Sequence, residues 1–223
     1  MAYRAGHSLE WSAMNLPTKI TFTRIVLVVL LWVFLFVMEA IHDSNMLLGN
    51  SGINLTYLIA CVVFLVASLS DFLDGYLARK RHEVTDLGKF LDPIADKLLV
   101  DSMLIYLAFP RYGNISISLI CVILMIARDL VIDAFRQVAA TRGTVLAASY
   151  FGKAKTVLQM AALVLVFLNG WPFSYFDAGW DPALRIVSWF VYLATAVSLL
   201  SMIDYLIKNR SVLKGGNEQH GQH

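Results

Sequence analysis

The sequence predicts an all-α, polytopic membrane protein with six transmembrane helices. The 223-residue chain is 58% hydrophobic and only 15% charged, far from the average composition of soluble proteins. Apolar runs that approach the ~20 residues needed to cross a bilayer recur along most of the chain. An unpaired backbone group is costly in lipid, so each run should be helical. The predicted spans are 20–41, 55–78, 93–110, 115–137, 155–172 and 184–207.

The first element should be a retained span rather than a cleaved signal. Its apolar run, IVLVVLLWVFLFVM, is longer than the hydrophobic region of a secretory signal, and no small-residue cleavage site follows it. Segment 1–19, before it, is expected to be cytoplasmic or interfacial, with Trp11 at headgroup level. The six spans should form one membrane domain, 20–207, and the polar tail 208–223 should be disordered.

The distribution of Lys and Arg predicts the orientation. The loops 42–54 and 173–183 contain neither residue and should face outward, where Trp171, Tyr175 and Trp180 would form an aromatic belt. Both termini and the segment 71–97 should therefore be cytoplasmic. The basic residues assigned to the cytoplasmic side are Arg4, Lys19, Arg24, Arg79, Lys80, Arg81, Lys89, Arg136, Arg142, Lys153, Lys155, Lys208, Arg210 and Lys214, against Arg111 and Arg185 on the other.

The second span leads into an unusually acidic segment. If the helix continues past Ser70, Asp71 and Asp74 lie about 60° apart around its axis and share a face. Gly75 and Ala78 share that stripe, and such small residues leave room for a ligand to approach the backbone.

The third span begins with a similar stripe. Gly88, Asp92 and Asp96 recur at intervals of four residues and can face the first stripe across a short cytoplasmic turn. Pro93 disfavours helical geometry at Asp92, so this stripe should lie in the first turns of a helix or be slightly bent.

Four converging aspartates cannot all stay ionised without a cation. Oxygen ligands without His or Cys favour Mg²⁺ or Mn²⁺, and four carboxylates can hold two ions. The alternative is a solvated loop whose acids pair with nearby basic residues. We assign that role to Glu83 and Asp86, the second of which could also cap the third helix, but not to the four regularly spaced aspartates, because Asp beside a span is usually functional.

The fourth span and the residues after it carry a group of basic side chains. Arg128 and Arg136 fall about 80° apart on one helix and could reach one cavity, while Lys153 and Lys155 would come from the following loop. The alternative pairs the arginines with acids inside the bundle, namely Asp129, Asp133, Asp101 or Asp204. Cys61 and Cys121 lie in apolar runs and should be small buried side chains.

The segment 71–96 resembles the signature of the CDP-alcohol phosphotransferases, D-x2-D-G-x2-A-R-x8-G-x3-D-x3-D. Every fixed position is filled: Asp71, Asp74, Gly75, Ala78, Arg79, Gly88, Asp92 and Asp96. NLPTKITFTRI at 15–25, ARDLVIDAFRQVAATRG and SYFGKAKT are similar to bacterial phosphatidylglycerophosphate synthases. The departures are Asp129, where Glu is expected, and Ala134-Phe135, in place of Gly-Leu.

The resemblance implies a six-helix enzyme, usually a homodimer of the bacterial inner membrane with its active site on the cytoplasmic side. Two divalent cations would help an alcohol to displace CMP, with CDP-diacylglycerol as donor and sn-glycerol 3-phosphate as acceptor. It implies no covalent enzyme intermediate. The implied metal ligands are Asp71, Asp74, Asp92 and Asp96, with Asp96 also the base. Gly75, Ala78, Arg79 and Gly88 would line the CDP site. A phosphorylated acceptor would be bound by the basic side chains of Arg128, Arg136, Lys153 and Lys155.

The resemblance also suggests that Asn15, Thr18, Thr21 and Arg24 contact the nucleotide. Alternatively, Asn15 and the residues after it mark a helix start, and Arg24 anchors a phospholipid headgroup. Two other functions stay open. One is a sibling transferase making cardiolipin or a phosphatidylinositol phosphate, although the basic residues favour a phosphorylated acceptor. The other is a cation transporter, although the internal repeats common in transporters are not visible.

Overall fold

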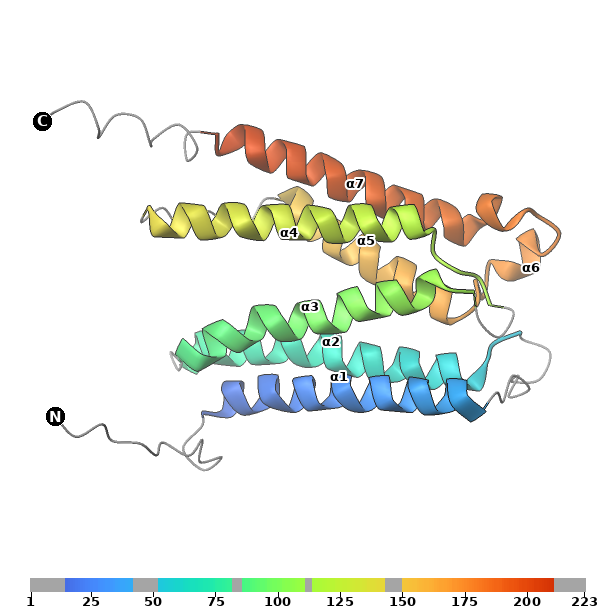
Figure 1. Ribbon diagram of the computed structural model, residues 1–223, viewed down its shortest axis with the longest axis horizontal. Helices are drawn as coiled ribbons and strands as arrows, with labels where there is room; N and C mark the ends of the chain where they lie inside the picture. Colours follow the sequence, from blue (N-terminus) through green and yellow to red (C-terminus); the bar gives the residue numbers. More distant parts are fainter. Residues whose placement is uncertain (1–14, 42–51, 82–85, 111–113, 143–149, 211–223) are drawn as a thin grey trace, which may run out of the picture. The chain divides into compact units, whose positions relative to one another are not determined.

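The computed structural model describes residues 15–41, 52–81, 86–110, 114–142 and 150–210, with only the backbone described at 16–17, 72–81, 86–87 and 89. The described chain is entirely helical, apart from turns, loops and an isolated bridge residue, Asn54, as the sequence predicts (Figure 1). Its long helices are α1 (Leu16–Ile41), α2 (Leu55–Arg81), α3 (Asp86–Ala108), α4 (Leu119–Thr141), α5 (Tyr150–Phe167) and α7 (Ile186–Lys208). Two short helices, α6 (Ser174–Asp177) and η3 (Pro182–Leu184), lie between α5 and α7.

Each predicted span overlaps one long helix. Among the described residues α1, α5 and α7 are long and apolar enough to cross a membrane. Helices α3 and α4 carry charged residues near their middle, such as Asp101 and Arg128. The chain divides into two compact units, Met1–Met103 and Leu104–His223, which we describe separately.

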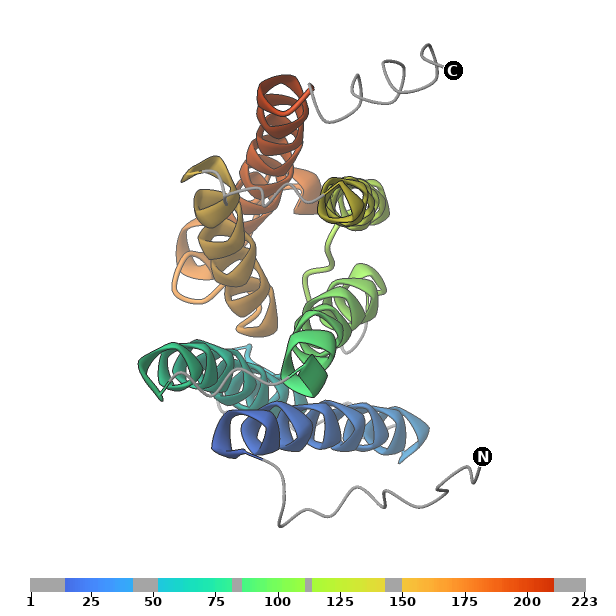
Figure 2. The ribbon, with the colours of Figure 1, turned by 90° about the vertical axis from the view of Figure 1, so that its left-hand side faces the viewer.

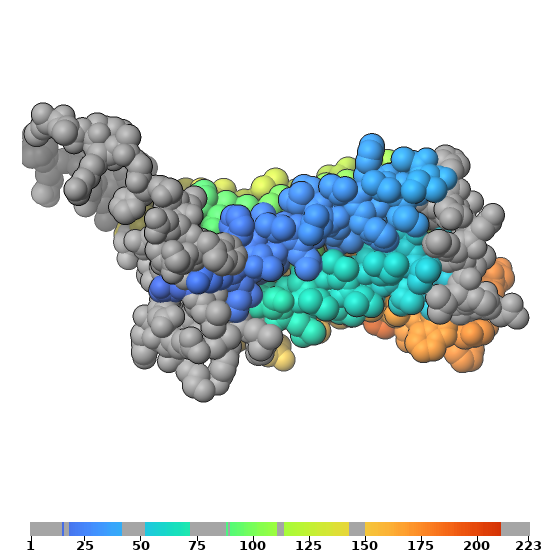
Figure 3. Space-filling model, turned by 90° about the horizontal axis from the view of Figure 1, so that it is seen from below, coloured from blue at the N-terminus to red at the C-terminus, as the bar shows by residue number. Residues whose placement is uncertain are grey.

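In the first unit, α1 and α2 lie side by side (Figures 1 and 2). The buried side chains of α1 recur every three or four residues, as Val28, Leu31 and Leu35 do, which is the spacing of a single helix face. The opposite face, visible in Figure 3, carries exposed apolar side chains such as Leu30 and Phe36. A large exposed apolar surface of this kind suits contact with lipid.

In the second unit, α7 packs against both α5 and α4. Its buried stripe is rich in small residues, including Ala194, Ser198 and Ser201. Small residues allow helix backbones to approach closely where the surrounding solvent is lipid. Ile132, Phe135 and Ala139 of α4 form a cluster with Tyr205 of α7.

Helix α5 ends five residues earlier than the predicted span, and its C-terminal cap explains why. Asn169 has a positive φ of 52°, its N–H donates to the Val166 carbonyl, and the Gly170 N–H donates to the Leu165 carbonyl. This Schellman arrangement satisfies the last carbonyls and stops the helix. Gly170 has a φ of 81°, a backbone conformation that favours glycine, and an added Cβ would also lie only 3.0 Å from Ile115 Cδ1.

The predicted starts of the fourth and fifth spans are corrected by the structure. Helix α4 begins at Leu119 rather than 115, because the Ile115 N–H donates to Asn169 Oδ1 and the Ile117 N–H to the Leu107 carbonyl. Helix α5 begins at Tyr150 rather than 155. Lys153 and Lys155 therefore lie in a helix and not in a loop.

The structure tests some of the remaining local predictions, which concern the cysteines and the aromatic residues. Cys61 and Cys121 are buried and free, as expected. Trp171, Tyr175 and Trp180 are exposed, as a membrane-interface belt would require. The expected interfacial position of Trp11, most of segment 1–19 and the tail beyond Arg210 lie outside the described residues.

Candidate functional site

Asp71 occupies the end of the apolar part of α2. The helix continues past it to Arg81, so Asp71 and Asp74 belong to one helix, as expected. The Asp71 side chain is 44% exposed and forms an ion pair with Arg24 of α1, whose own side chain is 1% exposed. Arg24 therefore binds a carboxylate of the first unit.

The other signature residues of α2 are placed by the backbone alone. Asp74, Gly75, Ala78 and Arg79 all lie within the helix, but their side chains are outside the described part of the structure.

The second acidic stripe lies on α3. This helix begins at Asp86, so the stripe with Asp92 and Asp96 lies in its first turns, as expected, and Pro93 lies inside the helix. Both aspartates are exposed, and Gly88 is buried. The Thr21 hydroxyl of α1 donates a hydrogen bond of 2.7 Å to Asp92 Oδ1.

The contacts of α1 involve one carboxylate from each acidic stripe. Thr21 and Arg24 are three residues apart, which puts them about one turn apart on neighbouring parts of one helix face. Thr21 binds Asp92 of α3, and Arg24 binds Asp71 of α2. One carboxylate from each stripe therefore reaches the same short stretch of α1.

The described donors suit a hard divalent cation. Asp71 and Asp92 are carboxylates that remain partly accessible, and no thiol or imidazole accompanies them in the signature. No group of three potential ligand side chains occurs among the described residues, and the Asp74 side chain is outside them. The complete quartet is thus still a prediction from the sequence.

A pocket of about 170 Å³ lies between α1 and α2, next to these contacts. Apolar residues, including Leu27 and Val66, form one part of its lining, and Lys19, Arg24 and Ser70 form another. Of the residues predicted to contact the nucleotide, Thr18 is buried, and Asn15 precedes α1 and accepts a backbone hydrogen bond from Lys19, as expected at a helix start.

The second unit holds a polar cluster inside its helices. Asp129 of α4 accepts a hydrogen bond from Arg128 Nη1 at 2.7 Å and two from Lys155 Nζ, at 2.9 and 2.7 Å. Arg128 also donates to the Ser198 carbonyl at 3.2 Å and to Ser201 Oγ at 2.9 Å. The structure therefore brings Arg128 and Lys155 together on one carboxylate, with α7 completing the surroundings.

Two further buried polar side chains belong to residues close to the members of this cluster on α5 and α7. Gln159 is one turn from Lys155 on α5, and Ser198 supplies the carbonyl that Arg128 contacts. In the part of the chain that the structure describes, Gln159 Nε2 and Ser198 Oγ are buried without a hydrogen-bond partner. Buried polar groups are normally satisfied by protein, water or a ligand, so this cluster retains hydrogen-bonding capacity.

The other two residues predicted to bind the acceptor phosphate, Arg136 and Lys153, do not contact Asp129 in the described structure. Arg136 is exposed, and its guanidinium lies 5.6 Å from the ring centre of Tyr205, with Nε 3.4 Å from the Tyr205 hydroxyl. Lys153 is exposed on α5. The alternative pairing of Arg128 with Asp129 is present, and whether either arginine also binds phosphate is still a prediction.

Sequence reasoning assigned Thr21 and Arg24 to the nucleotide and gave Gln159, Ser198 and Ser201 no role. A usable signal was present on α1, because Thr18, Thr21 and Arg24 are polar residues at three-residue spacing, which puts them on one side of a helix. The polar residues of α5 and α7 gave only the general signal that polar groups in apolar helices face the protein interior.

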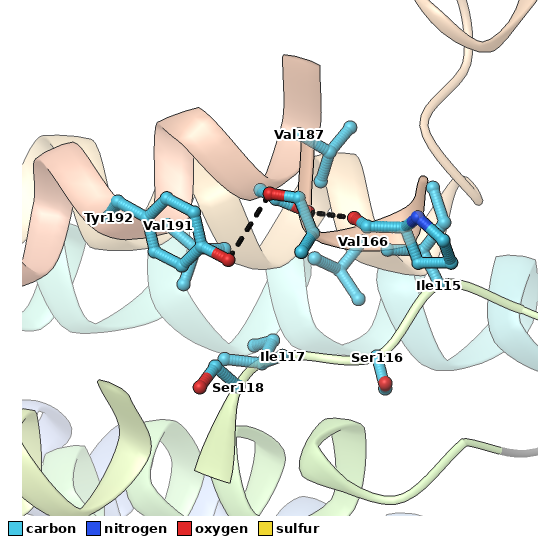
Figure 4. Close-up of a pocket in the computed structure, with 11 residues that line it drawn as sticks. Ile115, Ser116, Ile117, Ser118, Val166, Val187, Val191 and Tyr192 are labelled. Carbon is cyan, nitrogen blue, oxygen red and sulfur yellow. Dashed lines mark hydrogen bonds between the residues drawn. The ribbon is translucent and has the colours of Figure 1, made fainter. Parts of the chain in front are cut away.

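A second pocket, of about 240 Å³, contains none of the predicted site residues (Figure 4). It lies where α7 begins, beside the segment 115–118. On its wall the Ser188 hydroxyl donates to the Pro182 carbonyl at 2.6 Å and the Tyr192 hydroxyl to the Ala183 carbonyl at 3.2 Å. These hydroxyls hold η3 against α7.

The helical fold and the completed aspartate signature define a class of membrane transferase, and the comparison with known families agrees. Residues 14–202 match the CDP-alcohol phosphatidyltransferase family, to which this chain therefore belongs.

Curated relatives of the chain carry a common name. A Bacillus subtilis protein named CDP-diacylglycerol–glycerol-3-phosphate 3-phosphatidyltransferase is 37% identical over 91% of this chain and 99% of its own length. Proteins of the same name from Mycoplasma genitalium and Pseudomonas fluorescens are 38% and 32% identical. They match 79% and 86% of this chain, and 75% and 89% of their own lengths.

Proposed function

We propose that this protein is an enzyme that transfers a phosphatidyl group from CDP-diacylglycerol to sn-glycerol 3-phosphate, yielding phosphatidylglycerophosphate and CMP. The observation that carries the proposal is similarity at 37% identity along nearly the whole length of a relative with that name. The complete aspartate signature supports it, because the residues that the family chemistry needs are all present in this chain.

Asp71, Asp74, Asp92 and Asp96 are the residues that would hold two divalent cations, Mg²⁺ or Mn²⁺. Such ions supply charge neutralisation for a diphosphate as its leaving group departs. Asp96 would accept the proton of the acceptor hydroxyl, and no covalent enzyme intermediate is required. The contacts of Thr21 and Arg24 support this assignment, since they draw Asp92 and Asp71 to the same part of α1.

The CDP-lipid would be bound by Gly75, Ala78, Arg79, Gly88, Asn15 and Thr18. The buried state of Gly88 agrees with a close approach of chain or ligand at that point. The pocket beside Arg24, with cationic and apolar walls, has the mixed lining that a phospholipid requires.

The acceptor phosphate would be bound by Arg128 and Lys155, with contributions from Arg136 and Lys153. Asp129 holds two cations, so the described contacts leave a surplus of positive charge that suits an anion. The unsatisfied polar atoms of Gln159 and Ser198 give the same cluster donors for a hydroxylated ligand. These features favour a phosphorylated acceptor over a neutral alcohol.

In the bilayer we propose six spans, with both termini and the aspartates on the cytoplasmic side of the bacterial inner membrane. The orientation rests on the strong bias of Lys and Arg toward one side. We also propose a homodimer, on the family resemblance.

The test is product identification by mass spectrometry. Purified protein would be incubated with CDP-diacylglycerol and Mg²⁺ in the presence of glycerol 3-phosphate, phosphatidylglycerol or inositol phosphate. We expect phosphatidylglycerophosphate and an equimolar amount of CMP, from the first acceptor alone. A product formed only with either of the other acceptors would assign the enzyme to a sibling activity. Absence of CMP release with all three would contradict the transferase itself.

A further inference from the structure

We infer that α1 is a positioning element of the metal site, in which Thr21 fixes Asp92 and Arg24 fixes Asp71. This inference rests on the proposed function, since it concerns the two carboxylates as metal ligands. It assigns Thr21 and Arg24 to the carboxylates instead of the nucleotide, and it makes neither of them a catalytic residue.

The contact of Thr21 has the geometry of a specific hydrogen bond. The hydroxyl lies 2.7 Å from Asp92 Oδ1, and the threonine side chain is 1% exposed. Asp92 itself is exposed. A buried donor that holds one oxygen of an exposed carboxylate restricts its rotation and leaves the second oxygen available to a ligand.

The contact of Arg24 has the same arrangement with a charged donor. The buried guanidinium binds Asp71 Oδ1, and the Asp71 side chain remains 44% exposed. An arginine at this depth needs a counter-charge, because an isolated buried cation is costly. Asp71 supplies the counter-charge and is in turn held in one orientation.

The two contacts account for two of the three polar residues on the buried face of α1, the third being Thr18. Beyond Arg24 that face is apolar, with Val28, Leu31 and Leu35. Partners that orient metal ligands typically change metal affinity or activity by 10- to 100-fold when removed. The polar part of α1 therefore acts on the site through Asp71 and Asp92.

The experiment measures the affinity of the purified protein for Mn²⁺ in the absence of substrates. Mn²⁺ is titrated into the protein, and the electron paramagnetic resonance signal reports the concentration of free Mn²⁺. Thr21→Val replaces the hydroxyl by a methyl group of similar size, and Thr21→Ser restores the donor. Thr23→Val is the matched control, because Thr23 is exposed and its hydroxyl donates to Lys19 of its own helix. Arg24→Met and Arg24→Lys test the second contact.

We expect Thr21→Val to weaken Mn²⁺ binding roughly 10-fold and Arg24→Met by about 10- to 100-fold. Thr21→Ser should restore most of the affinity, Arg24→Lys should restore part of it, and Thr23→Val should leave it unchanged. The metal-free Thr21→Val and Thr23→Val proteins should have the same thermal unfolding midpoint. If Thr21 had only a structural role, Thr21→Val would have the lower midpoint.

Equal Mn²⁺ affinities in the wild-type and Thr21→Val proteins would overturn the inference while leaving the metal site intact. Tighter binding by Arg24→Met would also overturn it, because Arg24 would then act as a competing charge. If Arg24→Met does not fold, the Thr21 series still decides the question. A wild-type protein that binds no Mn²⁺ would overturn the metal centre of the proposed function, and the inference with it.

Discussion

The polar contacts of the two units differ in the ratio of cations to carboxylates. In the first unit Asp71 has one cationic partner and Asp92 has a hydroxyl partner, and both stay accessible. In the second unit Asp129 is bound by two cations and its side chain is only 17% exposed. The first arrangement has acceptor capacity left for a cation, and the second has positive charge left for an anion.

The contrast suits the two kinds of ligand in the proposed reaction. The two units use similar elements, since each places charged side chains within apolar helices and fixes them by contacts from a neighbouring helix. What distinguishes them is the sign of the charge that remains after the internal contacts are made. The proposed reaction needs both signs, a cation site for a diphosphate and an anion site for a phosphorylated acceptor.

The largest expected effect comes from removing a carboxylate of the first unit. Asp92→Asn should reduce turnover by more than about 100-fold, since changing even the partners of metal ligands costs 10- to 100-fold. The measurement is the initial rate of CMP release at saturating substrates and Mg²⁺, with thermal unfolding to show that the protein is folded.

The matched control for that change is Asp204→Asn. Asp204 pairs with the exposed Lys208 near the end of α7, and such surface pairs contribute little. Its rate should stay close to that of the wild type. If Asp92→Asn retained activity, Asp92 would not be a metal ligand, and the proposed cation site of the first unit would lose one of its carboxylates.

A smaller effect is expected from removing one cation of the second unit. Lys155→Met leaves the Arg128 and Asp129 pair intact but removes the surplus charge, so the KM for glycerol 3-phosphate should rise by roughly 10-fold, about the size of one charge-assisted hydrogen bond. Steady-state kinetics with varied acceptor would measure this, with kcat changing less than KM.

Lys153→Met sharpens the same test. Lys153 lies two residues earlier on α5 and is exposed, whereas Lys155 is bound to Asp129. We expect Lys153→Met to raise the KM for glycerol 3-phosphate less than Lys155→Met does. Equal effects of the two substitutions would mean that general surface charge, and not the Asp129 cluster, attracts the acceptor.

The smallest effect should come from Arg136→Ala. This guanidinium is exposed, and its described contacts are with the ring and hydroxyl of Tyr205. We expect a rise in the KM for glycerol 3-phosphate of no more than a few-fold, since an exposed cation loses much of its attraction to screening by solvent and salt. An unchanged acceptor dependence would remove Arg136 from the phosphate site.

Helix type and approximate position were predictable from the sequence because length and apolar composition leave few alternatives in lipid. The ends were less predictable. The fifth span ends early because Asn169 adopts a left-handed backbone and also binds the Ile115 N–H, a contact between residues far apart in the chain. No local pattern in the apolar run signals that pairing.

The candidate site shows the same limit. Spacing within one helix predicted that Asp71 and Asp74 share a helix, because that relation depends only on helical geometry. The partners Thr21 of Asp92 and Arg24 of Asp71 depend on how α1 packs against α2 and α3, which helical periodicity does not determine. Lys155 was assigned to a loop at the start of the fifth span, whereas the structure places it inside α5, where it pairs with Asp129.

The hydrogen bond between Asn169 and Ile115 has a mechanical consequence for the second unit. It ties the end of α5 to the segment leading into α4, and the caps at Asn169 and Gly170 fix the same corner. Lys155 lies fourteen residues back along α5, or roughly 21 Å at 1.5 Å per residue. Rotating α5 by about 5° around this tethered corner would shift the Lys155 ammonium by roughly 2 Å. A displacement of that size would break the 2.7 Å bond to Asp129, so the tether at this corner helps to keep the Lys155 ammonium in place.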